Sequence, residues 1–347
     1  IGEFFCSREL RTRAFARVAC VLLVLFSVGR AALQALLVAW YGTFYDLLQS
    51  AATSSSDAAL EQGRAGVYDG LLQFTRIALP WAVLAPLGAL LRRHFCFAWR
   101  MALVEAYMGR WRATRRAVPE GASQRVQEDT ARFSTGVELF AGKLLDGALK
   151  LFIFAPKLLR YGDVFAPPPL VPPPLRGRPW LLWLAGSLAA LSWGVSALIA
   201  SPLVDIEVAN QRIEAAFRKR LVLDEDATGA TAHAGEPSEA LLTALRRNYR
   251  ALYCNLCGFE EWLEVSMQMM IIVPFAVGAF QLFAAAEDER TGLGELMQLS
   301  AVFQTVYEVL SLPATNWADV QEFRSVLRRL HEFERSMAEE PGRSVLL

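Results

Sequence analysis

Several features that mark common protein classes are scarce in this sequence of 347 residues. It contains three histidines and five cysteines, too few and too scattered for a disulfide framework. Cys254 and Cys257 have a spacing that metal sites use, but we expect helical, buried thiols there instead of metal ligands. Positive charge is not in surplus, because 35 Lys and Arg balance 35 Asp and Glu. This balance argues against a protein that binds nucleic acid.

Catalytic signatures are missing as well. The phosphate-binding pattern G-x-x-x-x-G-K-[ST] does not occur in the sequence, and no nucleophile–base or metal-ligand constellation is visible. We therefore expect no ATP binding, no cofactor and no enzymatic activity from this chain.

Apolar sequence, in contrast, is abundant. Hydrophobic residues make up 54% of the chain, against about 45–50% in an average soluble domain, and they gather in long runs. A transmembrane helix needs about 20 mostly apolar residues. The runs predict an all-α membrane protein with six spans, at residues 15–40, 70–91, 136–159, 180–203, 262–286 and 293–312.

The basic residues of the loops predict the orientation of these spans. Arginines gather before span one, between spans two and three, between four and five, and after six, whereas the alternate loops are poorer in them. By the positive-inside rule, both termini are cytoplasmic. Residues 1–335 are then one transmembrane domain, followed by a short cytoplasmic tail at 336–347.

The cytoplasmic loops are predicted to be helical. Trp99–Arg116 has no proline, and Ser123 can cap a helix that begins at Gln124. Asp205–Leu223 and Glu239–Tyr253 have similar composition.

The outer loop Ala166–Pro179 is too rich in proline for a helix and should be extended. Long helices that project from a six-span core resemble the intracellular extensions of ABC-exporter transmembrane domains.

One polar stretch has a specific resemblance. "EGASQRVQEDTARF" (Glu120–Phe133), preceded by "FAWRMALVEAYMGRW" (Phe97–Trp111), resembles the central motif of the SbmA/BacA family of bacterial peptide transporters. "WYGTFYDLLQ" (Trp40–Gln49), "NQRIEAAFRKRLVLDEDA" (Asn210–Ala227) and "LRRLHEFE" (Leu327–Glu334) also match, in the same order. The resemblance covers roughly residues 40–335.

Membership of this family would imply a specific function. Its members resemble the membrane half of an ABC exporter without a nucleotide-binding domain, and they form homodimers in the inner membrane. They import antimicrobial and other peptides with the proton gradient as the driving force. A wide, acidic cavity would attract cationic or Pro-rich peptides. The family usually has more hydrophobic sequence before the first span than this chain does.

By motif position, the functionally important glutamates of the family map onto Glu128, Glu138, Glu214 and Glu225. In a membrane, a carboxylate of this kind should face a cavity. Glu138 follows Glu128 by ten residues on a predicted continuous helix, a rise of about 15 Å that leaves both on nearly one face. The sequence therefore predicts a ladder of proton-coupling carboxylates.

A structural role for the same residues stays open. Glu128 could pair with Arg125, Glu214 with Arg212 or Arg218, and Glu138 with Lys143 or Lys150. Asp146 and Lys150, four residues apart on a helix, are expected to pair with each other. Four polar residues of spans five and six are candidates for lining a cavity. They are Glu264, Gln268, Glu295 and Glu308.

Two other functions remain open. The chain could be the membrane subunit of an ABC half-transporter whose ATPase is a separate chain, because B12 and peroxisomal transporters share the six-span layout and a similar Gln-Arg motif. It could also be a membrane scaffold or enzyme without transport activity, which the lack of a nucleophile–base or metal-ligand constellation disfavours. ATP-independent uptake would favour the proton-driven family, and the absence of a cavity between protomers would favour the scaffold.

Overall fold

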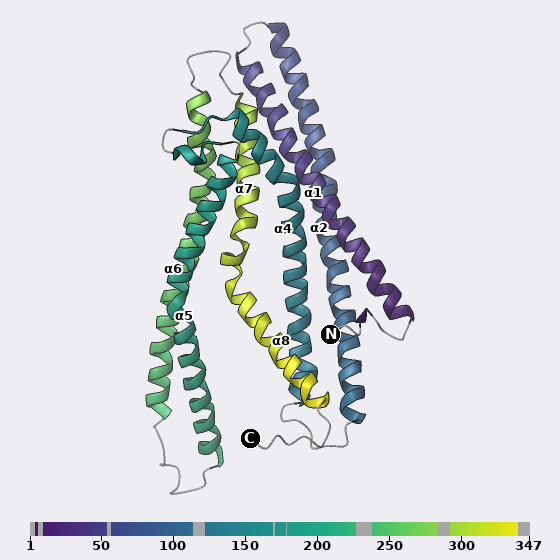
Figure 1. Cartoon of the computed structure of the whole chain (residues 1–347), viewed down its shortest axis with the longest axis vertical. Helices are drawn as coiled ribbons and strands as arrows, with labels where there is room; N and C mark the ends of the chain where they lie inside the picture. The colour runs from purple at the N-terminus through teal and green to yellow at the C-terminus, as the bar shows by residue number, and fades with distance from the viewer. Residues whose placement is uncertain are drawn as a thin grey trace. The chain divides into compact units, whose positions relative to one another are not determined.

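The computed structural model describes residues 4–5, 10–53, 57–113, 122–168, 171–177, 179–226, 238–282 and 292–338. Within these ranges the regular structure is helical, as predicted (Figure 1). The elements are α1 (Leu10–Thr53), α2 (Asp57–Ala113), α3 (Ala122–Gln124), the π-helical turn η2 (Arg125–Asp129), α4 (Thr130–Val164), the 3-10 turn η3 (Pro173–Leu175), α5 (Trp180–Asp226), α6 (Ser238–Leu282), α7 (Leu293–Thr315) and α8 (Trp317–Ala338).

Four of these helices are long and apolar enough to cross a membrane. They contain the candidate spans Arg11–Ala52 in α1, Glu61–Arg112 in α2, Trp180–Val222 in α5 and Ser238–Ala279 in α6. The third and sixth predicted spans fall in α4 and α7, which are not among the four. The charged side chains at positions 138, 143, 146 and 150 lower the hydropathy of α4. Six spans therefore remain a prediction, while four are supported.

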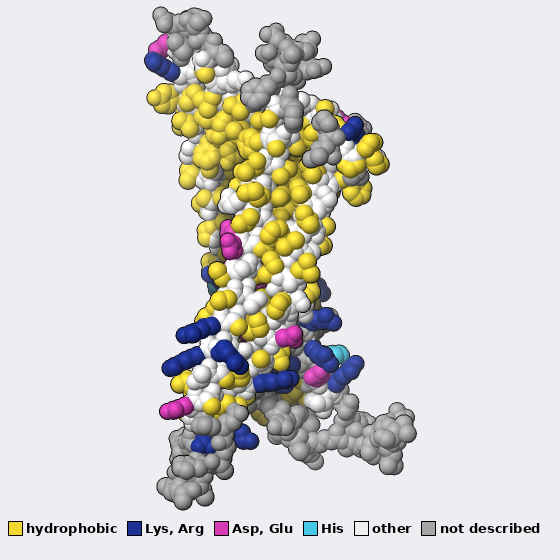
Figure 2. Space-filling view, turned by 90° about the vertical axis from the view of Figure 1, so that its left-hand side faces the viewer, with side chains coloured by type: hydrophobic (Ala, Val, Ile, Leu, Met, Phe, Trp, Pro, Cys, Tyr) yellow, Lys and Arg dark blue, Asp and Glu magenta, His cyan; other side chains and the backbone are white. Residues whose placement is uncertain are grey.

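The predicted extensions of the spans are helical. α2 has 57 residues, about 85 Å at 1.5 Å per residue, whereas the hydrocarbon layer is about 30 Å thick. Trp99 to Ala113 belongs to this helix, Asp205–Leu223 to α5 and Glu239–Tyr253 to α6. On the face drawn in Figure 2, hydrophobic side chains cover the upper part and Lys and Arg side chains gather toward the lower end. The helices thus combine an apolar section with a charged end.

The proline-rich loop differs slightly from its prediction. Most of its described residues are outside helices, and Pro172 has the dihedral angles of a polyproline conformation, φ −57° and ψ 141°. Pro173–Leu175 nevertheless forms one 3-10 turn, η3, because proline at the first turn has no amide hydrogen that needs a partner. The loop is thus extended except for this turn.

The chain folds into two compact units. Unit 1 comprises Ile1–Leu182, Pro274–Val309 and Asn316–Leu347, and unit 2 comprises Trp183–Val273 and Leu310–Thr315. In unit 1, α1 and α2 lie side by side along their length (Figure 1). Small residues permit this approach: Cβ atoms built at Gly66 and Gly70 of α2 would lie only 3.2 and 2.8 Å from Leu47 and Phe44 of α1. α4 packs on both helices and also contacts α8.

Unit 2 contains most of α5 and α6. The side-chain amide of Asn248 in α6 donates a hydrogen bond to the carbonyl oxygen of Ile206 in α5 at 3.1 Å. The hydroxyl of the next residue, Tyr249, donates to the carboxylate of Glu214, eight residues after Ile206 in α5. The two cysteines of the CxxC pair in α6, Cys254 and Cys257, are free and exposed. The expectation that they are buried was wrong, because one face of α6 leaves them uncovered.

Candidate functional site

Three of the sequence motifs meet in one apolar cluster of unit 1, which we call the α8 cluster. Leu103 and Tyr107 come from α2, Phe133 from α4, and Leu330 and Phe333 from α8, and all five are at least 96% buried. α8 is strongly amphipathic, with apolar residues at three- and four-residue intervals on the face that it turns to the cluster. Residues of Phe97–Trp111, Glu120–Phe133 and Leu327–Glu334 therefore pack together in the fold.

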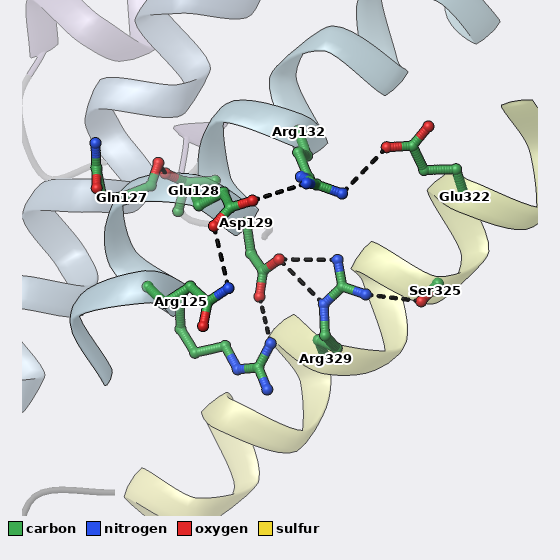
Figure 3. A network of polar contacts seen from close by, with 10 residues as sticks. Arg125, Gln127, Glu128, Asp129, Arg132, Glu322, Ser325 and Arg329 are labelled. Carbon is green, nitrogen blue, oxygen red and sulfur yellow. Dashed lines mark hydrogen bonds and ion pairs between the residues drawn. The ribbon is translucent and has the colours of Figure 1, made fainter. Parts of the chain in front are cut away.

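A buried carboxylate lies beside this cluster (Figure 3). Asp129, 2% exposed, accepts hydrogen bonds from Arg125 at 2.7 Å and from Arg329 of α8 at 2.9 and 3.0 Å. Arg329 also donates to the hydroxyl of Ser325 at 2.8 Å. Burial raises the pKa of Asp129, but the hydrogen bonds from Arg329 and then Arg125 outweigh burial and lower that pKa below its ordinary value. Asp129 is therefore held ionised between two guanidinium groups.

Glu128 belongs to a second, more exposed chain of contacts (Figure 3). Its carboxylate accepts hydrogen bonds from Arg132 at 2.7 Å and from Gln124 at 3.1 Å. Arg132 continues the chain to Glu322 of α8 at 3.4 Å. The suggested pair of Glu128 and Arg125 is not formed, because the guanidinium of Arg125 binds Asp129 instead. Glu128 is half-exposed and ties η2 to α4.

The predicted helix around the central motif exists, but it has an irregular turn. The helix begins at Ala122, so Ser123 lies inside it, and the prediction that Ser123 is the N-cap was wrong. Arg125–Asp129 is a π-helical turn, which holds more residues per turn than an α-helix. The prediction that Glu128 and Glu138 lie on one helix face assumed 3.6 residues per turn. The π-helical turn, which includes Glu128, does not have this periodicity. The two carboxylates also have different arginine partners.

Glu138 lies in a polar cavity between α1, α2 and α4. Its carboxylate accepts a hydrogen bond from Nε of Arg93 in α2, at 3.2 Å, and the Glu138 side chain is 32% exposed. The cavity has a volume of about 470 Å³, and Glu138 and Arg93 both line it. The predicted partners of Glu138, Lys143 and Lys150, were wrong. Glu138 thus has one cationic neighbour and lines an open space.

The predicted pair of Asp146 and Lys150 is present, with an N–O distance of 3.4 Å. Lys143 instead donates a hydrogen bond to the side-chain carbonyl of Asn316, at the start of α8. These contacts account for the charged residues of the third predicted span. Glu138, Lys143, Asp146 and Lys150 each have a polar partner, which lowers the cost of placing this part of α4 in a membrane.

The charged lining of the cavity is mainly basic. It comprises Arg30, Arg92, Arg93 and Lys143 against Glu138 and Asp146. The sequence analysis missed the first three as site residues. The interruption of an apolar span by Arg30 was the available signal, because an ionisable residue inside a membrane helix marks a functional site by default. This cavity therefore differs from the acidic one that the family resemblance implied.

The other predicted site residues lie elsewhere. Glu214 is exposed in unit 2 and accepts the hydrogen bond from Tyr249. The side chain of Glu225 lies outside the described part. The four candidates for lining a cavity are all exposed on α6 and α7, and none of them lines the cavity around Glu138. They are Glu264, Gln268, Glu295 and Glu308.

The motif at Trp40–Gln49 caps another helix. Oδ1 of Asp46 accepts a hydrogen bond from the backbone N–H of Gly294 at 2.8 Å, and Oε1 of Gln49 accepts one from Leu293 at 2.9 Å. These are amides of the first turn of α7, which have no partner inside their helix. Trp40 donates from its indole to the carbonyl of Gly70 at 2.8 Å. The motif thus joins α1 to both α7 and α2.

A comparison with protein families gives the same identification as the motifs. The model of the SbmA/BacA-like family matches residues 10–338. This range includes both the α8 cluster and the cavity around Glu138. The chain belongs to the SbmA/BacA-like family.

Proposed function

We propose that this protein is a secondary transporter of the inner membrane that imports peptides, cationic or Pro-rich ones among them, with the proton gradient as the driving force. Family membership and four helices long enough to cross a membrane support a membrane transporter. The observation that carries proton coupling is the position of Glu138: a carboxylate in the third predicted span, half-buried, facing a cavity and paired with a single arginine.

The pair of Glu138 and Arg93 suits a cycle of protonation. While ionised, Glu138 is stabilised by the guanidinium of Arg93. After protonation the attraction between the two is lost, so the link between α2 and α4 weakens. A change of this kind can bias two arrangements of the helices, which is the requirement for coupling protons to transport. In the proposed assembly, two copies of the chain form a homodimer with both termini in the cytoplasm.

The decisive experiment is peptide uptake into proteoliposomes that contain only this chain. A labelled Pro-rich peptide should accumulate when the outside is acidified, and a protonophore should abolish the accumulation. ATP inside or outside should have no effect. Uptake that needs ATP and a second chain would support the alternative, a subunit of an ABC half-transporter. No uptake under either condition would contradict transport of this peptide class.

A further inference from the structure

The basic cavity contains an arginine whose polar atoms are incompletely satisfied. Nε of Arg30 is buried and has no hydrogen-bond partner in the part of the chain that the structure describes. The guanidinium carbon lies 5.7 Å from the ring centroid of Trp81, so one face of the group is covered by the indole. A buried donor without an acceptor is costly, and this one lines a space of about 470 Å³.

The lining has more positive than negative groups. The four basic side chains exceed the two acidic ones by two formal charges. Both acids already have cationic partners, Glu138 in Arg93 and Asp146 in Lys150. Arg92 adds a guanidinium at the wall: a Cβ built at Gly142 would lie only 2.5 Å from Nη1 of Arg92. Arg30, Arg92 and Lys143 therefore have no carboxylate partner among the described residues, and Arg30 and Arg92 are the two guanidinium groups of this set.

The depth of Arg30 restricts the anion that can reach it. Arg30 precedes Trp40, the predicted outer end of span one, by ten residues, or about 15 Å of helix. That distance is half the thickness of a hydrocarbon layer of about 30 Å. Lipid phosphates stay at the surface of this layer, whereas a transported molecule passes through its middle. Arg92 and Arg93 follow residue 91, the predicted inner end of span two, so the cavity reaches from the middle of the layer to its inner surface. A lipid phosphate could approach the Arg92 end, whereas the deep end at Arg30 is within reach of the cargo, and the test below separates the two.

We propose that the cavity binds the C-terminal carboxylate of the transported peptide, between Arg30 and Arg92. This inference rests on the proposed function. A guanidinium matches a carboxylate with two parallel N–H donors, and every linear peptide has a terminal carboxylate whatever its sequence. Arg93, the partner of Glu138, belongs to the same lining, so a carboxylate bound between Arg30 and Arg92 lies in the same cavity as Glu138. Binding of cargo is thereby linked to the proton-exchanging residue.

The test compares one Pro-rich cationic peptide in two forms, with a free C-terminal carboxylate and with a C-terminal amide. Binding is measured to the full chain in nanodiscs of zwitterionic lipid, and gradient-driven uptake in proteoliposomes. Hydrogen bonds to charged groups contribute about 1.5–3 kcal/mol, so the free acid should bind at least about tenfold more tightly. The amide should be taken up correspondingly less at low concentration.

Three variants locate the effect. Arg30→Gln removes the deep guanidinium and should abolish the preference for the free acid. Gly142→Ala keeps every charge but displaces the end of Arg92, so it should reduce the preference in a chain that still folds. Arg76→Gln is the matched control, because Arg76 is exposed on α2 and does not line the cavity. It should retain the full preference.

The outcomes separate this inference from the proposed function. Equal binding and uptake of the two forms would refute carboxylate recognition and leave peptide transport standing. Uptake of neither form would refute the proposed function and with it this inference. If the forms are equivalent but Arg30→Gln loses an anionic phospholipid that co-purifies with the wild type, the cavity holds a lipid headgroup, which also refutes the inference.

Discussion

Arg329 of α8 donates two hydrogen bonds to a single carboxylate oxygen of Asp129, at 2.9 and 3.0 Å. The two residues are 200 positions apart in the sequence, and their contact joins the last described helix to the turn that precedes α4. Arg125 binds the other oxygen of the same carboxylate. A buried group of charges is costly to break, because removal of one member leaves the others without a partner.

Asp129→Asn should therefore destabilise the protein strongly. The substitution leaves Arg125 and Arg329 facing each other without the anion between them, and loss of a buried partner costs about 3–5 kcal/mol. The melting temperature in detergent should fall clearly. Glu128→Gln is the matched control, since its half-exposed ion pair with Arg132 contributes about 0–1 kcal/mol. Similar melting temperatures for the two variants would argue against a structural role for Asp129.

The contribution of Asp129 should depend on pH. The pKa of Asp129 is lower in the folded protein than its ordinary value, which is about 3.9 in an unfolded chain. Ionised Asp129 thus adds stability above about pH 4, and this stability is lost as the pH falls through the folded-state pKa. The difference in melting temperature between wild type and Asp129→Asn should be constant at neutral pH and shrink below about pH 4. A constant difference down to pH 3 would disprove the assignment.

Gly136 should be intolerant of any side chain. A Cβ at this position would lie 2.1 Å from Cδ2 of Phe323 in α8, so the ring or the helix must move. Gly136→Ala should therefore lower the free energy of unfolding by about 1–3 kcal/mol, as overpacking does. Gly109→Ala is the control, because a Cβ there meets nothing within 4 Å, and alanine favours a helix by up to about 1 kcal/mol over glycine. The two variants should shift the melting temperature in opposite directions.

The cap that Asp46 supplies to α7 can be separated from its charge. Asp46→Ala removes the acceptor for the Gly294 amide and should cost about 0.5–2 kcal/mol. Asp46→Asn keeps an oxygen in the same place and should retain most of the stability. Thermal unfolding together with hydrogen exchange at the first turn of α7 measures both. If both variants exchange as slowly as the wild type, the cap is not needed.

The sequence predicted the helices well because their apolar runs are long. A run of about 20 apolar residues has few alternatives to a helix, and the segments Trp99–Arg116, Asp205–Leu223 and Glu239–Tyr253 contain no proline to end one. The limits of the helices were harder to predict. Residues 99 to 113 extend α2 without a break, whereas a π-turn interrupts the stretch from Gln124 to Phe133. The π-turn contacts α8, which is distant in the sequence, and the local sequence has no clear signal for such a turn.

The partners of the charged residues were mostly beyond prediction. Only the pair of Asp146 and Lys150 lies within one helix, where spacing determines proximity. Glu138 and Arg93 are 45 residues apart, and Asp129 and Arg329 are 200 apart. These residues are close because α2, α4 and α8 pack together. The spacing of residues along the sequence does not predict which helices pack against each other. An arginine in the middle of an apolar run, such as Arg30, is the strongest sequence signal of this cavity.

Glu138→Gln should abolish gradient-driven uptake without unfolding the protein. The variant resembles the protonated residue permanently, so no proton can be carried, and each charge moved is worth about 2.3 kcal/mol per 100 mV. Stability should change little, because Arg93 is 71% exposed and a pair this open contributes about 0–1 kcal/mol. Uptake by proteoliposomes and melting temperature give the two readings. Glu138→Asp keeps a carboxylate one methylene shorter and should be partly active.

Arg93→Gln distinguishes proton coupling from a purely structural ion pair. If the pair only ties α2 to α4, removal of either partner should have the same effect, and both variants should lose uptake equally. If Glu138 exchanges the proton, Arg93→Gln keeps the carboxylate in its cavity and should retain part of the gradient-driven uptake, whereas Glu138→Gln retains none. The double variant should then behave like Glu138→Gln alone. Proton-driven uptake at the wild-type rate by a well-folded Glu138→Gln protein would end the assignment of Glu138 as the coupling residue.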